Sequence, residues 1–270
     1  MKRHIFSYTA EELTPYIDWS YFYHAWGIEP QKSACEKALE VRRDAEDLLR
    51  KTAHEKVANA VFALCDAKSD GDNIIVENTT FPLLRQQHAR QGEPCLCLSD
   101  FVSPHSDKIG LFATTVHNTQ PPCESHTYEG LLTQTIATRL AEAAATLLHK
   151  DVRRNPHLWG YAPDEALTPA ELNAEKFQGI RPAVGYPSLP DQTVIFIIDS
   201  LLNMQEAGIT LTPNGAMHPH ASVCGLMIAH PAARYFSVGN ISEEQLRDYA
   251  QRRGISTVDL HKFLYKNLPK

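Results

Sequence analysis

The regular spacing of apolar side chains is clearest in residues 131–149, where it predicts a long helix. Within this stretch, apolar side chains recur every three or four positions, which places them on one face of a helix. They are Leu132, Ile136, Leu140, Ala143 and Leu147. The pattern therefore predicts an amphipathic helix that packs one side against a core.

Capping residues mark where other helices begin. Residues 9–12 read TAEE and have the form of a capping box. Residues 168–171 combine an N-cap threonine, a proline at the first helical position and a capping-box glutamate. This second helix should end near 177–178, because Gly179 and Pro182 follow. Further helices are predicted as two within 33–64, one over 192–208, one from Ser242 to Gly254 and one from Ser256.

Runs of β-forming residues predict a short strand and two strand pairs. The short strand covers 74–78, and the pairs combine 95–104 with 108–117 and 221–230 with 234–242. Each pair joins neighbouring segments, with helices before, between and after. This order favours an α+β fold with an antiparallel sheet over a parallel doubly wound one.

The stretch 180–192, IRPAVGYPSLPDQ, interrupts the helices. Its prolines lack a backbone donor and push the preceding residues towards extended geometry, so it cannot be helical. It predicts a stiff strip whose backbone groups have no helix or sheet partner and are free to meet a ligand. The residues that impose this geometry are Pro182, Gly185, Pro187 and Pro190.

Two charged residues are candidates for ligand contact. Arg181 begins the strip, and its guanidinium suits a carboxylate or phosphate; the alternative is a surface salt bridge. Asp18 lies among six aromatic residues in 16–26, where an unpaired acid is costly. It suits a ligand ammonium group, or it is simply the N-cap of the following helix.

Other marked residues have ordinary explanations when they are considered alone. Tyr235 and Phe236 read as strand aromatics, and Glu142 and Glu175 read as solvated helix residues. The histidines of 218–220, with His230, lack a further ligand at telling spacing, so no metal site is expected.

Composition narrows the class of protein. The chain has 270 residues, 43% hydrophobic and 21% charged, with a net charge of −6. The negative charge argues against general affinity for nucleic acid or anionic membrane, and no apolar run approaches the ~20 residues that span a bilayer. The start has a basic tip without an apolar core, so we expect a cytosolic protein.

The cysteines and the common nucleotide-binding and hydrolase motifs do not indicate a function for this chain. No CxxC pair occurs, and a cytosolic chain of this size needs no disulfides. The sequence also lacks GxGxxG, GxxxxGK[ST] and GxSxG, which removes the best support for common nucleotide-binding and hydrolase functions. The six cysteines are Cys35, Cys65, Cys95, Cys97, Cys123 and Cys224.

Several longer stretches between residue 15 and residue 254 form a family pattern when they are taken together. They are PYIDWSYF, LRQQ, CLSDFVSP, DKIGLFATT, TRLAEAAATLLH, WGYAPDEALTPAEL, GIRPAVGYPSLPDQT and AMHPHASVCGLMIAHP. With these stretches in the same order, the chain resembles the activation domain of cobalamin-dependent methionine synthase. The resemblance implies that 1–270 form a single C-shaped α+β domain with a twisted antiparallel sheet flanked by helices. It also implies that S-adenosylmethionine lies extended in a shallow groove.

The resemblance also implies which residues bind that ligand. They are Asp18, Arg181, the backbone of Ala183, the ring of Tyr186, Tyr235, Phe236 and the two acids near the sulfonium, Glu142 and Glu175. The residue types fit, because Asp18 suits the ammonium, Arg181 suits the carboxylate, and aromatic faces and acids suit a sulfonium cation.

The chain departs from the family pattern at several positions. Phe236 replaces the usual second tyrosine, Gln192 replaces a histidine, and Val184 replaces a proline. The segment between Asp18 and Asp72 looks shorter than in full-length enzymes. No folate, homocysteine or cobalamin module is recognisable, so we expect a free-standing domain that is inactive alone.

The expected role is reductive reactivation of oxidised cobalamin, without a catalytic acid or base in this chain. The implied partners are a cobalamin-binding methionine synthase module and a flavodoxin-like electron donor. The alternative is a non-catalytic S-adenosylmethionine sensor, or a partner of another corrinoid methyl-transfer protein.

Overall fold

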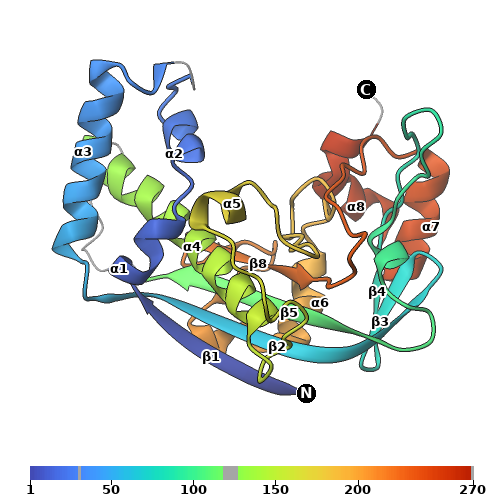
Figure 1. Cartoon of the computed structure of the whole chain (residues 1–270). Coiled ribbons are helices and arrows are strands. Elements are labelled where there is room, and N and C mark those ends of the chain that lie inside the picture. Colours follow the sequence, from blue (N-terminus) through green and yellow to red (C-terminus); the bar gives the residue numbers. More distant parts are fainter. Residues whose placement is uncertain (30–31, 118–126, 269–270) are drawn as a thin grey trace.

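A twisted antiparallel sheet carries the helices of the molecule (Figure 1). The structure is a computed structural model that describes residues 1–29, 32–117 and 127–268. Within them, six strands form the main sheet in the order β4-β3-β2-β5-β8, with β1 paired to β2. The strands are β1 (Lys2–Thr9), β2 (Lys56–Asp70), β3 (Asn73–Val76), β4 (Thr79–Pro82), β5 (Asp107–Val116) and β8 (Ser222–Met227), with β6 (Thr210–Leu211) and β7 (Met217–His218) forming a separate pair.

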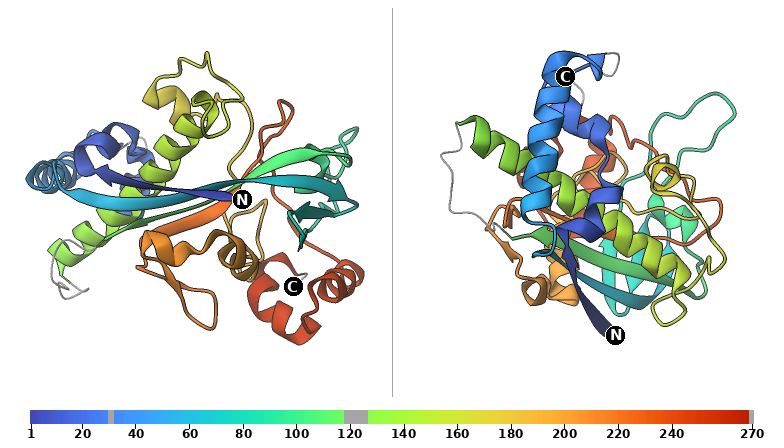
Figure 2. Two further views of the ribbon diagram at one scale, coloured as in Figure 1. Left: turned by 90° about the horizontal axis from the view of Figure 1, so that it is seen from below. Right: turned by 60° about the vertical axis from the view of Figure 1, so that its left-hand side comes forward.

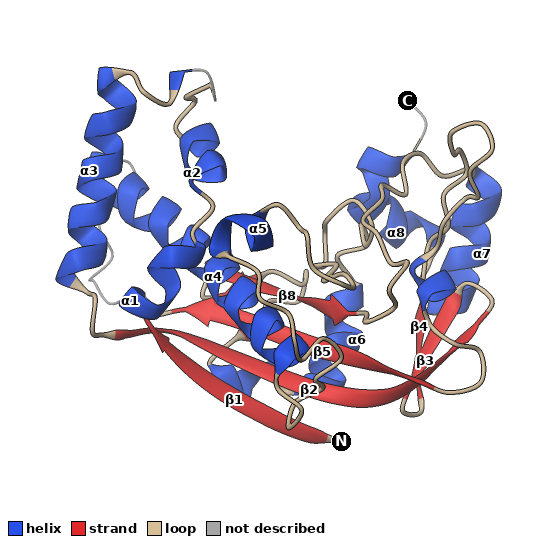
Figure 3. Ribbon diagram, viewed as in Figure 1, coloured by secondary structure: helices blue, strands red, loops and turns tan. Residues whose placement is uncertain are grey.

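The helices rise from both ends of this sheet and cover its faces, as the colours of Figure 3 show. The α-helices are α1 (Ala10–Leu13), α2 (Trp19–Ala25), α3 (Glu36–Lys51), α4 (Tyr128–Arg154), α5 (Pro169–Asn173), α6 (Val194–Leu202), α7 (Glu243–Arg253) and α8 (Thr257–Leu264). Short 3₁₀ turns occupy Thr14–Tyr16, Leu98–Phe101, Met204–Ala207 and Tyr265–Asn267. No helix in the described ranges has both the length and the apolar character needed to cross a membrane.

The two central strands, β2 and β5, form the core of the sheet. They pair antiparallel from Ala58 opposite Val116 to Ala67 opposite Asp107. Side chains alternate between the two faces: Phe62 packs in the cluster that contains α4, and its neighbour Val61 packs in the cluster that contains α6. Figure 2 shows α4 on one side of the sheet and α6 on the other. Both faces are therefore buried, which explains the nearly continuous apolar run in β2.

The outline of the molecule is a C (Figure 1), in which α2 and α3 stand at one end and α7 and α8 at the other. The second end has its own hydrophobic cluster and is attached to the rest by a buried polar network. The Tyr249 hydroxyl donates to Asp191 Oδ2 at 2.7 Å, and Arg253 Nη2 donates to Thr193 Oγ1 at 2.7 Å. These bonds connect α7 to the end of the proline-rich strip and to the start of α6.

Several helices begin and end as the sequence predicts. Thr9 and Thr168 form complete capping boxes, and the helix predicted over 131–149 is the centre of α4. Ser242 caps α7, which ends at Gly254, and Ser256 caps α8. These signals are confirmed because they depend on contacts within one helical turn.

Three predicted segments were wrong. Residues 33–64 do not contain two helices, because the strand β2 begins at Lys56. Residues 95–104 form a 3₁₀ turn rather than a strand, since the carboxylate of Asp100 caps the amide of Cys97 at 2.8 Å. Residues 234–242 are irregular. The partners of β5 and β8 are therefore distant strands, with β5 between β2 and β8, and not sequence neighbours.

Two helix ends also differ from the prediction. The helix from Pro169 ends at Asn173, and the chain turns where Glu175 adopts a left-handed conformation with φ of 55°. The helix predicted to reach Gly208 ends at Leu202, because Asn203 is left-handed and a 3₁₀ turn follows. Both breaks are made by non-glycine residues with positive φ, which sequence patterns rarely reveal.

Candidate ligand-binding groove

A groove of about 540 Å³ lies between α4, the strip and the segment around Tyr235. The start of α2 and the turn after α5 complete its walls. All eight residues that the sequence marked as a binding site line this one groove. They are Asp18, Glu142, Glu175, Arg181, Ala183, Tyr186, Tyr235 and Phe236.

The strip forms one side of the groove by continuing the sheet beyond β8. The Val184 amide donates to the Cys224 carbonyl at 2.9 Å, and the Leu226 amide donates to the Pro182 carbonyl at 3.0 Å. The strip passes so close that a Cβ on Gly225 would lie 2.2 Å from the Pro182 oxygen. The expectation that the backbone of the strip lacks partners is therefore wrong for these groups, because a distant strand supplies them.

One backbone group of the strip does remain available. Ala183 lies opposite Gly225 of β8, and the hydrogen bonds between the strip and β8 are made by the residues on either side of this pair. The amide of Ala183 itself therefore points away from β8. Its carbonyl accepts the Tyr186 amide at 3.2 Å, whereas no described residue accepts its N–H. Because Ala183 lines the groove, this N–H is a fixed donor for a ligand.

Arg181 has its backbone fixed and its side chain largely unengaged. Its amide donates to the Tyr235 hydroxyl at 2.9 Å. Its two terminal nitrogens each lie 3.4 Å from Thr146 Oγ1. Among the described residues it forms no ion pair, so the alternative of a surface salt bridge is not realised. A half-buried guanidinium without a protein carboxylate suits an anionic ligand group.

Asp18 combines the two roles that the sequence left open. It is the N-cap of α2, where its Oδ1 accepts the Ser20 amide at 2.9 Å and also the Ser20 hydroxyl. It also lines the groove. These bonds use only one carboxylate oxygen, so the second can accept from a ligand cation.

The two acids of the groove are held differently. Glu142, on α4, accepts a hydrogen bond from the Tyr186 hydroxyl, which joins two sides of the groove. Burial raises the pKa of Tyr186, and the Glu142 carboxylate adds to this effect, so the tyrosine is a neutral donor. Glu175 follows α5 in a left-handed conformation, and burial raises its pKa while Arg181 opposes the shift. Neither acid is only a solvated helix residue.

Tyr235 and Phe236 belong to an irregular wall and not to a strand. The Val238 amide donates to the Pro187 carbonyl at 2.9 Å, which ties this wall to the strip. The Phe236 ring packs against Phe101 at 6.5 Å between centroids. The wall therefore depends on side-chain and backbone contacts with distant segments.

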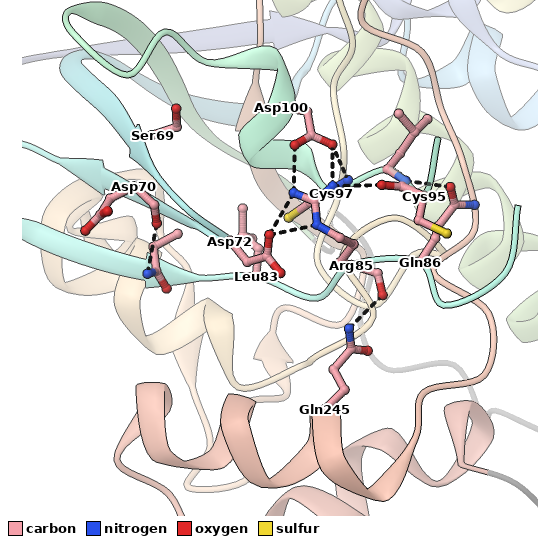
Figure 4. A network of polar contacts seen from close by, with 12 residues as sticks. Ser69, Asp70, Asp72, Leu83, Arg85, Gln86, Cys95, Cys97, Asp100 and Gln245 are labelled. Carbon is pink, nitrogen blue, oxygen red and sulfur yellow. Dashed lines mark hydrogen bonds and ion pairs between the residues drawn. The ribbon is translucent and has the colours of Figure 1, made fainter. Parts of the chain in front are cut away.

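The LRQQ stretch supports this wall from outside the groove. Figure 4 shows the polar contacts of Arg85 that hold this stretch. The Arg85 guanidinium makes two hydrogen bonds to Asp100, at 2.8 and 2.7 Å, and reaches Asp72 at 2.7 Å. It also donates to the Cys95 carbonyl at 2.7 Å. These contacts fix the loop that carries Gln86, whose side chain donates to the Ser237 carbonyl at 2.8 Å.

Sequence reasoning missed other residues of the groove. Arg139 and Thr146 lie three residues before and four residues after Glu142, so helical spacing on α4 could have indicated them. Phe177 gives no such signal. Its ring packs edge-on to buried His149 at 4.9 Å and lies 4.5 Å from the Arg153 guanidinium. The remaining missed residues are Tyr16, Tyr21, Leu172, Asn173, Pro182, Pro187, Ser188 and Ser237.

Two further sequence features lie away from the groove lining. Gln192 donates to the Gly215 carbonyl at 3.2 Å and supports the strip beneath Gly185. Within the described parts of the chain, no three His, Cys, Asp or Glu side chains are grouped to hold a metal ion. Five cysteines there are free thiols, and Cys123 lies outside the described residues.

The fold and the groove define a class of protein: an α+β domain with an open groove lined by side chains of both charges. The chain belongs to the family described as vitamin B12 dependent methionine synthase, activation domain, whose model matches residues 9–254. It is also similar to a solved structure, the MetH reactivation domain bound to AdoHcy. The two share 34% sequence identity with a TM-score of 0.90, over 100% of this chain and 91% of that one. The resemblance and the predicted fold class are thus confirmed.

Proposed function

We propose that this chain binds S-adenosylmethionine in the groove and supports reductive methylation of the cobalamin of a methionine synthase. The observation that carries the proposal is that Arg181, which has no carboxylate partner among the described residues, lies in the same groove as Asp18. The two offer opposite charges to one amino acid moiety. Membership of the family and the AdoHcy held by the similar structure support the choice of ligand.

Each part of the ligand has a suitable partner. Arg181 binds the carboxylate through its planar fork, and the free oxygen of Asp18 accepts from the ammonium. The Ala183 amide donates to an acceptor of the adenosine. Glu142 and Glu175 balance the sulfonium charge, and the rings of Tyr186 and Tyr235 add cation–π attraction. Phe236 contributes an apolar face only.

Transfer of the methyl group does not require a general acid or base from the protein. The methyl group leaves the sulfonium, and the sulfur keeps the electron pair of the broken bond and becomes the neutral thioether of S-adenosylhomocysteine. Cobalamin, presented by a partner module, supplies the nucleophile after reduction by a flavodoxin-like donor. The groove residues hold the ligand extended and fix the direction of its methyl group, which is a positional contribution.

A reconstitution experiment tests the proposal. The protein is mixed with methyl-labelled S-adenosylmethionine, a cobalamin-bound methionine synthase that lacks its activation domain, and a low-potential reductant. We expect label on cobalamin with all components, and none when the protein or reductant is omitted. If the ligand binds and no label moves in the complete mixture, the domain acts as a sensor of S-adenosylmethionine and the proposed reactivation is wrong.

A further inference from the structure

The wall of the groove, residues 235–238, has no regular secondary structure, so its position depends on a few hydrogen bonds. Two of them come from the strip: the Arg181 amide meets the Tyr235 hydroxyl, and the Val238 amide meets the Pro187 carbonyl. A third comes from outside, where Gln86 Nε2 donates to the Ser237 carbonyl at 2.8 Å. Gln86 itself does not line the groove.

The Gln86 amide is fixed in one orientation by partners with fixed roles. Its Oε1 accepts the Leu96 amide at 3.0 Å, and its own backbone amide donates to the Leu96 carbonyl at 2.9 Å. A backbone N–H can only donate and a carbonyl can only accept. The side chain therefore satisfies both partners only when Nε2 faces the Ser237 carbonyl and Oε1 faces the Leu96 amide.

The loop that carries Gln86 is itself rigidly held. Arg85 connects it to Asp72, Asp100 and the Cys95 carbonyl. From α7, Gln245 Nε2 donates to the Arg85 carbonyl at 2.9 Å. The Ser237 carbonyl thus meets a donor whose position is fixed by both a charged network and a helix.

We propose that Gln86 is a positioning residue for the ligand groove, acting through the Ser237 carbonyl on the wall that carries Tyr235. This inference rests on the proposed binding of S-adenosylmethionine. The physical reason is that losing the donor frees the centre of the wall. Tyr235 then holds the Arg181 backbone less firmly, and the guanidinium loses part of its orientation. Ordering these groups when the ligand binds costs affinity.

A glutamate at position 86 tests the two hydrogen bonds of the Gln86 side chain one at a time. The variant Gln86→Glu keeps an acceptor for the Leu96 amide, but it places an oxygen against the Ser237 carbonyl. We expect its Kd for S-adenosylmethionine, measured by calorimetry, to rise about tenfold, the equivalent of one lost hydrogen bond. Gln86→Lys keeps a donor for Ser237 and should bind within about threefold of wild type.

The neighbouring residue provides a matched control for charge. Gln87 is adjacent and also lies outside the groove, and its Oε1 accepts the Ser242 hydroxyl at 3.3 Å. Gln87→Glu therefore adds the same charge while it keeps its bond. Its Kd should remain that of wild type. Equal losses in the two glutamate variants would assign the effect to charge and overturn the positioning role.

A double-mutant cycle distinguishes positioning from a general structural role. If Gln86 acts through the wall, Gln86→Glu should have little further effect on Kd in a Tyr235→Phe background. An undiminished effect there overturns the inference. Gln86→Met, which removes the donor without adding charge, serves if the glutamate variant does not fold by circular dichroism. Wild-type protein that fails to bind overturns the proposed function as well, whereas equal affinities of wild type and Gln86→Met overturn this inference alone.

Discussion

The arginines of this chain differ in how far the protein already satisfies their charge. Arg85 is surrounded by two carboxylates and serves the fold. Among the described residues, the Arg181 guanidinium has no carboxylate partner: two of its nitrogens lie 3.4 Å from the Thr146 hydroxyl, and it lies 6.0 Å from the centre of the Phe112 ring. A guanidinium without a protein carboxylate remains able to attract an anion, so Arg181 is the arginine that we expect to bind the ligand carboxylate.

Removing the Arg181 side chain should weaken binding of S-adenosylmethionine by about 2–4 kcal/mol, roughly 30- to 1000-fold. Arg181→Lys should recover only part of this loss, because an ammonium cannot make the planar fork. Titration calorimetry measures both. Arg234→Ala is the control, since Arg234 is an exposed arginine beside the same wall and does not line the groove. An unchanged Kd for Arg181→Ala would contradict the assigned role.

Glu175 should make ligand discrimination depend on pH. Its pKa is raised by burial above the ordinary value of 4.5, so the acid is neutral at low pH and becomes a carboxylate as pH rises. The carboxylate attracts a sulfonium but not a neutral thioether. The affinity of S-adenosylmethionine relative to S-adenosylhomocysteine should therefore increase as pH rises through the raised pKa. Groups that both ligands share titrate in the same way, so their effects cancel in the ratio of the two affinities.

Glu175 should also make the stability of the protein depend on pH, but stability should fall as pH rises, whereas the affinity ratio should increase. A raised pKa means that the folded protein favours the protonated form, so ionisation of Glu175 costs stability as pH rises above 4.5. Glu175→Gln should flatten both pH profiles, the affinity ratio and the unfolding free energy. A ratio that still varies equally with pH in Glu175→Gln would assign the effect to another group, such as Glu142.

At the scale of elements, the groove depends on how closely the strip approaches β8. The strip makes four hydrogen bonds with this edge of the sheet: two join Ile180 to Ile228, one comes from the Val184 amide and one goes to the Pro182 carbonyl. Gly225 leaves the space for this approach. A free sheet edge is thereby covered, and the Ala183 amide is turned towards the groove. The proline-rich strip is stiff in itself, but β8 determines where it lies.

Gly225→Ala should disturb both stability and binding. The added Cβ would lie 2.2 Å from the Pro182 oxygen and 2.8 Å from the Ala183 Cα, so backbone must move. We expect a loss of roughly 2–3 kcal/mol in unfolding free energy, measured by chemical denaturation, together with weaker ligand binding. A variant with native stability and native Kd would show that the strip does not need this approach.

At the scale of the whole molecule, the groove brings together residues from Tyr16 to Ser237. The strip, α4 and the wall come from distant parts of the chain, and each is anchored to the central sheet or to α7. Tyr186 remains 49% exposed at the groove. A bound ligand would therefore present part of its surface to a partner that covers the opening.

Binding of the ligand and of a cobalamin-bound module should be coupled. We expect the module to lower the Kd of S-adenosylmethionine by about 5- to 150-fold, and the ligand to lower the Kd of the module by the same factor, as linkage requires. Calorimetry of each pair, with and without the third component, measures both factors. Independent binding, with a factor of one in both directions, would contradict coverage of the ligand by the partner.

Much of the local structure followed from short-range signals. The capping residues Thr9, Thr168, Ser242 and Ser256 mark helix starts correctly, because the atoms involved lie within four residues of one another. That the strip is not helical followed from its prolines, whereas the turns at 184–185 and 187–188 interrupt the extended course that they predict. The family motifs also indicated eight of the residues that line the groove, although periodicity alone gave ordinary explanations for most of them.

The sequence by itself thus determined where several helices start, that residues 180–192 cannot be helical, and which family motifs are present. Only the tertiary structure decided the partners of the strands, the irregular course of residues 234–242 and the short helix before Glu175. The physical reason is that β pairing and wall contacts join residues far apart in the chain, such as Gln86 with Ser237. Their energies depend on what the rest of the fold places beside them, which no local pattern records.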